Sequence, residues 1–266
     1  MAAQFLACID WSRPWLEHVR FTGQAISNAN DWRDETNRRA SEMGLKNRLG
    51  LPIRFVPQTD LPAGIAYETF IHDTGCVPTR ENLHDFFNAL VWLTFPQIKV
   101  QLNALQAVEI GRARLSGATS LRGKLRDAAT IFDENAALLV TSNESLVDAL
   151  RAHEWQDVLL TRRETFVQTS RIFLFGHALM EKLVTPYKSI TAHMWVVVGN
   201  ELQLPTDLTL QDYCAAIDGQ VVEKLKDGLT THAFSPLPIL GIPDWWKGQN
   251  EDFYRDEKVF RPRRLQ

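Results

Sequence analysis

Residues 77–99 read VPTRENLHDFFNALVWLTFPQIK and hold the densest run of apolar, aromatic and reactive side chains in the sequence. Asn82 is a favoured residue type at helix N-caps. Asp85, three positions later, favours a helix start because a carboxylate stabilises the positive end of the helix dipole. We therefore predict a helix that follows Asn82, runs to about Thr94 and ends before Pro96.

The predicted helix carries two kinds of side chain. At about 100° per residue, its apolar residues cover one broad side, whereas His84, Asp85 and Asn88 fall together on the other. The helix dipole disfavours an imidazolium in the first turn, so His84 could serve as a general base or a metal ligand. The alternative is structural, with Asp85 capping the helix and His84 hydrogen-bonded in a crevice of the core.

The composition is that of an ordinary globular protein, with 266 residues, 45% hydrophobic and 23% charged, and a net charge of −3. No apolar run approaches the roughly 18 residues that a membrane helix needs, and the first residues lack the pattern of a signal peptide. The three cysteines are far apart and odd in number, which favours reduced thiols. We therefore expect a cytoplasmic protein without membrane association.

Periodicity and capping patterns predict the remaining elements. Further helices are expected at about residues 12–26, 31–44, 97–112, 143–153 and 210–225, with another after Thr161. Strands are expected at residues 53–56, 65–71, 129–133 and 137–141, the last two forming a hairpin around Asp133-Glu134-Asn135. Residues 190–198 favour a buried strand, with a short helix as the alternative. The fold class is therefore α+β, predominantly helical, with a small antiparallel sheet.

Residues 235–266 differ from the rest of the chain. Their four prolines preclude regular structure, yet they include three Phe or Tyr and two Trp residues, Trp245 and Trp246, which a disordered tail would not hold. We predict an extended, irregular C-terminal arm packed on the body. Because no linker or repeat is visible, we predict one domain over residues 1–266.

Two further groups of residues could bind a metal ion. Asp127, Asp133 and Glu134 offer the oxygen ligands that Mg²⁺ or Mn²⁺ prefers, although acidic residues also favour turns for their own hydrogen bonds. His177 and Glu181 share a helix face at a spacing of four, and His193 follows Pro186. These could complete a zinc or iron set; the alternative is an intrahelical hydrogen bond and a buried histidine.

A basic segment offers a weaker candidate for phosphate or nucleic-acid contact. Arg122, Lys124 and Arg126 lie in and after GATSLRGK, which superficially resembles a phosphate-binding loop. Five residues separate its glycines instead of four, and no Ser or Thr follows the lysine. A solvated surface loop is the competing interpretation.

Several sequence blocks resemble an uncharacterised bacterial family, domain-of-unknown-function family 3025. They are YETFI at Tyr67, the segment at Val77, LRDAATIFDENAALLV at Leu125, GHALMEKLVTPY at Gly176, ITAH at Ile190, and PLPILGIPDWW with FYRDEKVFRP in the tail. The resemblance covers most of the chain after residue 66. It implies a bacterial cytosolic protein and no established activity.

The leading functional prediction is a hydrolase-type enzyme with a histidine and carboxylate site, built from His84, Asp85, Asp127, His177 and His193. The catalytic residues would be His84, Asp85 and His177, and the metal ligands His84, Asp127, His177 and His193, around Zn²⁺, Mn²⁺ or Mg²⁺.

This prediction requires that His84, Asp85, His177 and His193 converge in one cleft. The substrate would be an unidentified small or phosphate-bearing molecule. The competing prediction is a non-catalytic protein whose arm, with Trp245 and Trp246, binds a protein or nucleic-acid partner.

Overall fold

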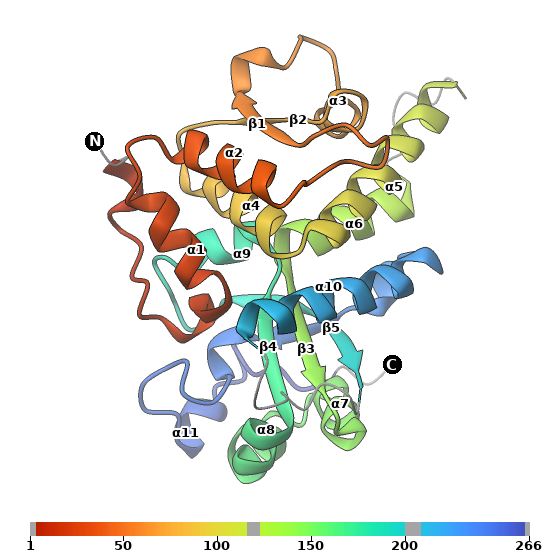
Figure 1. Cartoon of the computed structure of the whole chain (residues 1–266). Helices are drawn as coiled ribbons and strands as arrows, with labels where there is room; N and C mark the ends of the chain where they lie inside the picture. The colour runs from red at the N-terminus through yellow and green to blue at the C-terminus, as the bar shows by residue number, and fades with distance from the viewer. Residues whose placement is uncertain (1–3, 116–122, 200–208, 264–266) are drawn as a thin grey trace.

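The helix predicted after Asn82 forms as α4, Leu83–Thr94, in the computed structural model, which describes residues 4–115, 123–199 and 209–263. The Asn82 side chain accepts a hydrogen bond from the Asp85 backbone nitrogen at 2.8 Å, as expected of the cap. Every residue from Asp85 to Leu93 is buried, whereas His84 in the first turn is partly exposed, so the polar side of α4 faces other parts of the protein except at His84. Helices pack against α4 on several sides (Figure 1).

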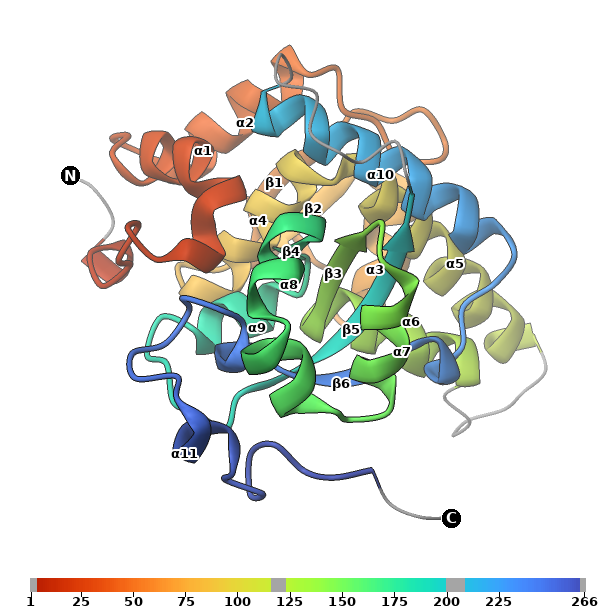
Figure 2. The ribbon, with the colours of Figure 1, turned by 90° about the horizontal axis from the view of Figure 1, so that it is seen from below.

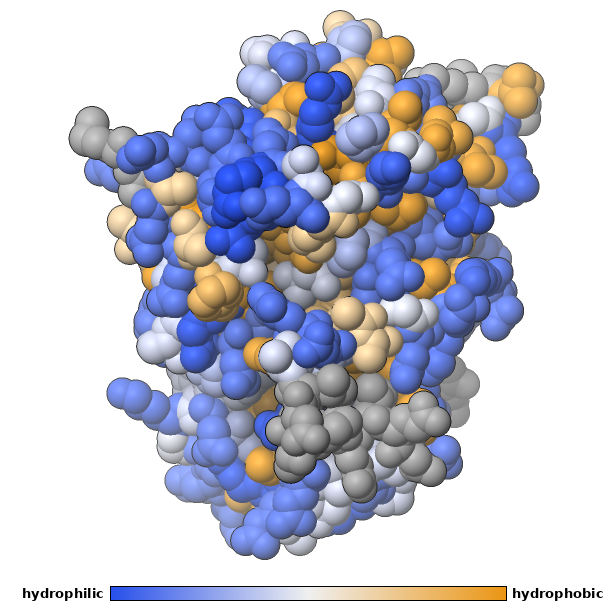
Figure 3. All heavy atoms as spheres, viewed as in Figure 1, coloured by the Kyte–Doolittle hydropathy of each residue, from blue (hydrophilic) through white to orange (hydrophobic). Residues whose placement is uncertain are grey.

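The chain is predominantly helical, as predicted. The helices around α4 are α1 Glu17–Ser27, α2 Trp32–Glu42, α3 Tyr67–Thr74, α5 Pro96–Leu115, α6 Lys124–Asn135, α7 Glu144–Arg151, α8 Arg163–Thr169, α9 His177–Lys182, α10 Leu210–Lys226 and α11 Glu251–Tyr254. The charged residues of α2 give the surface a hydrophilic area in Figure 3, because Asp34, Arg38 and Glu42 point into solvent.

Two small sheets accompany the helices. The strands β3 Ala136–Thr141, β4 Ser170–Leu174, β5 Thr191–Val198 and β6 Ser235–Pro238 form one sheet in the order β4-β3-β5-β6, and β1 Arg54–Pro57 pairs with β2 Cys76–Thr79. The pairs β3–β5 and β1–β2 are parallel, so the predicted antiparallel sheet is only roughly right. Long connections through β4, α9 and α3 permit the parallel pairings.

The strands of the larger sheet run between two groups of helices. In Figure 1, β3 descends from the region of α4, α6 and α9 towards α7 and α8. Figure 2 shows α7 and α8 from below, in front of the same strands. The start of β3 therefore lies close to the helices that carry His84 and His177.

Two predicted strands are helices in the structure. Residues 65–71, whose apolar pattern alternates, belong mostly to α3, which ends at Gly75 in the left-handed conformation at φ +74°. Residues 129–133 belong to α6, in which the buried residues Ala128, Ala129, Phe132 and Asp133 recur at helical spacing. The hairpin turn predicted around Glu134 is thus the end of a helix that leads directly into β3.

The C-terminal segment begins as a strand, β6, which pairs antiparallel with β5. Its large apolar side chains are buried, among them Leu237, Ile239, Leu240, Phe253, Tyr254 and Phe260. Trp245 is half-buried with its ring 6.0 Å from that of Trp15. Among the helices of the described ranges, none has the length and apolar character needed to cross a bilayer.

His18 links the first helix to the larger sheet and should make stability pH-dependent. Its Nε2 donates to the Leu174 carbonyl at 2.8 Å, and burial lowers the pKa of His18 to about 4. Between pH 6.5 and 4, His18 is therefore protonated in the unfolded chain but neutral in the folded chain. The free energy of unfolding falls as the pH falls through this window, by up to about 3 kcal/mol. The substitution His18→Gln keeps a donor but does not titrate, so urea unfolding of this variant should depend less on pH across that window. Equal pH slopes for the two proteins would contradict this expectation.

Candidate functional site

His84 lies in the first turn of α4, where the Asn82 cap fixes the start of the helix. Its Nδ1 is 3.0 Å from Oε2 of Glu181, which lies one turn into α9. A carboxylate oxygen only accepts, so Nδ1 of His84 carries the proton and Nε2 presents its lone pair. The Glu181 carboxylate thereby orients the imidazole.

His177 is the first residue of α9 and follows Gly176 at a point of very close approach. A Cβ on Gly176 would lie 2.5 Å from the Asn135 Cα, and the Gly176 nitrogen donates to the Ala136 carbonyl at 2.8 Å. A side chain at this position would therefore push α9 away from the junction between α6 and β3. Glycine here is what allows His177 to contact the last turn of α6, which carries Glu134.

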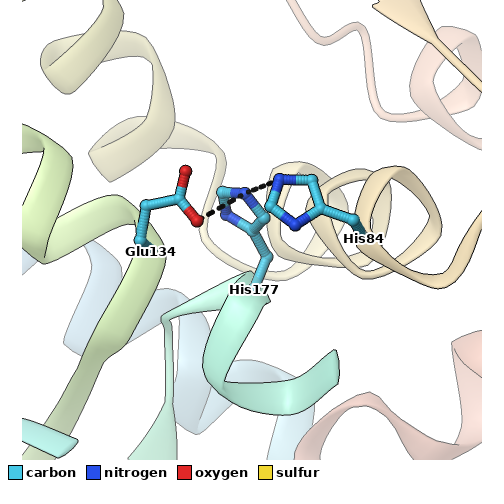
Figure 4. Close-up of side chains that lie close together, drawn as sticks. All are labelled: His84, Glu134 and His177. Atoms are coloured by element: carbon cyan, nitrogen blue, oxygen red, sulfur yellow. Dashed lines mark hydrogen bonds and ion pairs between the residues drawn. The ribbon is translucent and has the colours of Figure 1, made fainter. Parts of the chain in front are cut away.

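The side chains of His84, His177 and Glu134 converge from three helices (Figure 4). The two Nε2 atoms of the histidines are 3.1 Å apart, and Nε2 of His177 is 3.6 Å from Oε2 of Glu134. One possible ligand atom from each residue lies within 4.8 Å of the other two. Across residues 4–115, 123–199 and 209–263, no other group of His, Cys, Asp and Glu meets this criterion.

Burial keeps the His177 imidazole neutral. Its side chain is 4% exposed, and loss of hydration lowers the pKa of His177 to about 4. Its Nδ1 is buried without a hydrogen bond and lies 3.9 Å from Oδ2 of Asp133, an acceptor. With the proton on Nδ1, the lone pair of His177 Nε2 faces that of His84, an arrangement that a shared cation would stabilise.

A buried network of hydrogen bonds lies next to the site. The Lys99 ammonium donates to Oδ1 of Asp133 at 2.5 Å and to Oδ1 of Asn88 at 2.8 Å, and Asn88 donates to the Tyr67 hydroxyl at 3.1 Å. Burial raises the pKa of Asp133, but the Lys99 charge and hydrogen bond, together with the nearby histidines, outweigh it, and the pKa lies below its usual value. Asp133 is thus held as a carboxylate beside His177.

Three of the site residues predicted from the sequence do not join this cluster. Asp85 accepts hydrogen bonds from the Arg80 backbone nitrogen and guanidinium, at 2.6 to 3.0 Å, so it anchors the start of α4. His193 Nδ1 is 2.9 Å from Nδ2 of Asn135, and neither His193 nor Asp127 belongs to the group of converging ligand atoms. Of the four residues predicted to converge, only His84 and His177 contact each other. Arg122, predicted to contact phosphate, lies outside the described residues.

From the sequence, Glu134 was grouped with the wrong partners and Lys99 was not identified. Glu134 was grouped with Asp127 because residues 129–133 were read as a strand; on α6 it points to the histidines instead. Lys99 had no assigned role, although a lysine on an apolar helix next to Ile98 indicates a buried charge that needs a partner. Lys124 of the basic segment is exposed at the start of α6.

The family model described as "Protein of unknown function (DUF3025)" matches residues 53–264, and the chain belongs to this family. The matched region includes all three converging residues, together with Lys99, Asp133 and Glu181. No curated protein and no solved structure matches the chain.

Proposed function

We propose that His84, His177 and Glu134 bind one divalent transition-metal ion and that the protein is a metal-dependent hydrolase. The observation that carries this proposal is that a carboxylate lies behind each imidazole: Oε2 of Glu181 is 3.0 Å from the Nδ1 of His84, and Oδ2 of Asp133 is 3.9 Å from that of His177. Metal-binding histidines characteristically turn their other ring nitrogen to such a partner.

The separations suit a small ion. Two nitrogens each about 2.0–2.1 Å from zinc lie roughly 3.3 Å apart at a tetrahedral angle. The corresponding separation between His84 and His177 is 3.1 Å, and that between His177 and Glu134 is 3.6 Å. The third pair, His84 and Glu134, has ligand atoms within 4.8 Å of each other, and side-chain rotation would have to bring these two closer to seat one ion among the three.

The ligand set favours zinc or ferrous iron. Imidazole nitrogens suit these metals, whereas Mg²⁺ prefers oxygen ligands throughout. Of the metals predicted from the sequence, Zn²⁺, Mn²⁺ and Mg²⁺, a set of two histidines and one carboxylate favours Zn²⁺. Glu134 and Glu181 also supply two negative charges to match a dication, since the charge of Asp133 is already compensated by Lys99.

The open side of the cluster suits catalysis. The side chain of His177 is buried, whereas those of His84 and Glu134 are 28% and 39% exposed, so solvent and a substrate can reach the ion. Three protein ligands leave a coordination position for water, as in catalytic zinc sites. The chemistry that a bound metal supplies there is activation of that water for attack on an ester, amide or phosphate ester.

The test begins with metal analysis of the untagged protein by mass spectrometry after dialysis. We expect about one equivalent of zinc or iron per chain. Chelation should remove it, and a panel of ester, amide and phosphate-ester substrates should show hydrolysis that chelation abolishes and Zn²⁺ or Fe²⁺ restores. Protein that neither retains nor takes up a metal would instead support a metal-free acid–base pair of His84 and His177.

Glu181 offers a test of the outer carboxylates that leaves the ligands intact. The substitution Glu181→Ala removes the acceptor of the His84 Nδ1–H group, so zinc affinity should fall by roughly 10- to 100-fold. Because the Glu181 side chain is 40% exposed, the melting temperature of the metal-free protein should change little. Glu223→Ala, which removes an exposed carboxylate paired with Lys226, is the matched control. Equal affinities for the two variants would contradict the orienting role.

A further inference from the structure

A cavity with a volume of about 670 Å³ lies between the edge of the larger sheet and the C-terminal segment. Its walls come from the residues around β5 and β6, the segment after α7, and the segment that follows α11. Figure 2 shows where α7, β5, β6 and α11 lie. Its lining residues are His153, Trp155, Ser189, Thr191, Pro236, Pro238, Lys258, Val259, Arg261, Pro262 and Arg263. A volume of this size falls within the range of small-molecule sites, about 300–1,000 Å³.

The charged side chains of this cavity all have one sign. Lys258, Arg261 and Arg263 line it, and no acidic residue does, in a chain whose net charge is −3. Lys258 lies near Asp256 and helps to lower the pKa of that carboxyl. No ion pair within the described residues involves Arg261 or Arg263, whereas most other arginines whose side chains are described form one. Three positive charges around one cavity favour an anion that carries more than one negative charge.

The cavity is held in shape by the core. Nδ1 of His153 and Nε1 of Trp155 both donate to the Arg261 carbonyl, at 3.1 and 2.9 Å. Val259 and Phe260, which lie between Lys258 and Arg261 in the chain, are buried. The backbone that carries the basic side chains is therefore held by the core. His153 has a left-handed backbone at φ 63° because it ends α7: the His153 nitrogen donates to the Leu150 carbonyl at 3.0 Å and the Glu154 nitrogen to the Ala149 carbonyl at 2.9 Å.

The remaining walls are apolar or carry hydroxyl groups. Trp155, Pro236 and Pro238 offer apolar surface, and the His153 ring lies 4.9 Å from that of Trp155 at an interplanar angle of 30°. Ser189 and Thr191 add hydroxyl groups at the start of β5. Such walls suit a flat or apolar body attached to the anionic group.

We infer that this cavity binds a small organic phosphate monoester, with its phosphate among Lys258, Arg261 and Arg263 and its body against the Trp155 side. A phosphate carries a charge of about −1.5 to −2 at neutral pH and three acceptor oxygens, which matches several cationic donors better than one carboxylate does. The cavity shares no residue with the His84, His177 and Glu134 cluster, so the inference does not depend on the proposed metal site.

Phenylphosphonate is a suitable probe because it joins a dianionic group to a ring and cannot be hydrolysed. Calorimetric titration is performed on full-length protein treated with chelator, to remove any contribution of a metal. We expect saturable binding that weakens as salt is raised, and tighter binding than that of inorganic phosphate. The double variant K258Q/R263Q should bind phenylphosphonate at least about 10-fold more weakly.

The matched control is K46Q/R48Q, which removes the same charge from exposed residues outside the cavity and should bind like the unaltered protein. No binding at millimolar phenylphosphonate, or equal loss in both double variants, would overturn the inference. Equal affinity for inorganic phosphate and phenylphosphonate would overturn the role assigned to the apolar walls. The substitution His84→Ala should leave this titration unchanged even if it abolishes metal binding, which separates the two proposals.

Discussion

The substitution His84→Ala is expected to lower zinc affinity by more than about 100-fold, because it removes one of the three proposed ligands. Loss of a ligand should weaken binding more than the roughly 10- to 100-fold expected for loss of an outer partner. His84 is partly exposed, so folding should survive. Competition against a chromophoric zinc chelator measures the affinity. His177→Ala should have an effect at least as large, although that side chain is buried and its loss will also lower stability.

His193→Ala is the control that distinguishes this site from the larger histidine set expected from sequence. His193 contacts Asn135, next to Glu134 in the chain, but its nitrogens lie outside the converging group. Zinc affinity of this variant should stay within a few-fold of the original. If His193→Ala weakened binding as strongly as His84→Ala, the ligands would be wrongly assigned.

The largest expected effect on stability follows from removing residues 235–266. The truncation deletes β6 and many buried apolar side chains, each of which contributes roughly 2–5 kcal/mol, against a total stability of about 5–15 kcal/mol for a typical domain. We expect insoluble protein or a chain that proteases digest rapidly. A truncated chain that melted cooperatively near the temperature of the full one would show that the tail is dispensable.

A point substitution tests the same packing with a measurable outcome. Phe260 is 4% exposed, and its ring lies 4.9 Å from that of Tyr254; Gly241 has room only for hydrogen beside it. Phe260→Ala should lower the free energy of unfolding by about 3–5 kcal/mol in urea titrations. Phe21→Ala, at a position 75% exposed, should change it by less than about 0.5 kcal/mol.

The fold was predictable where local chemistry agrees with the tertiary structure. The start of α4 follows from Asn82, whose side chain forms the expected cap, and β5 follows from an apolar run at residues 190–198. The strand predicted at residues 65–71 is wrong because their alternating pattern also fits a short helix with one buried residue, Ile71. The pairing of β3 with β5 could not be predicted, since parallel registry depends on contacts between distant segments.

The candidate site was predictable only in part, for the same reason. His84 and His177 were singled out because imidazoles on apolar segments need polar partners, and they contact each other. Asp85 has an equally good local reason to be polar, its hydrogen bonds with Arg80, and sequence spacing does not distinguish the two situations. Glu134 required the correct secondary structure of residues 124–135 before its direction could be known.

The close contact between Gly176 and the junction of α6 and β3 also has a thermodynamic consequence. The three proposed ligands come from α4, α6 and α9, and this docking brings them together, so an ion held by them would bind the assembled chain and not the unfolded one. Saturation at about 1,000 times the dissociation constant would then add roughly 4 kcal/mol to the free energy of unfolding. A larger residue at position 176, as in Gly176→Ala, should therefore weaken zinc binding without altering any ligand, and the melting temperature should become less responsive to added zinc.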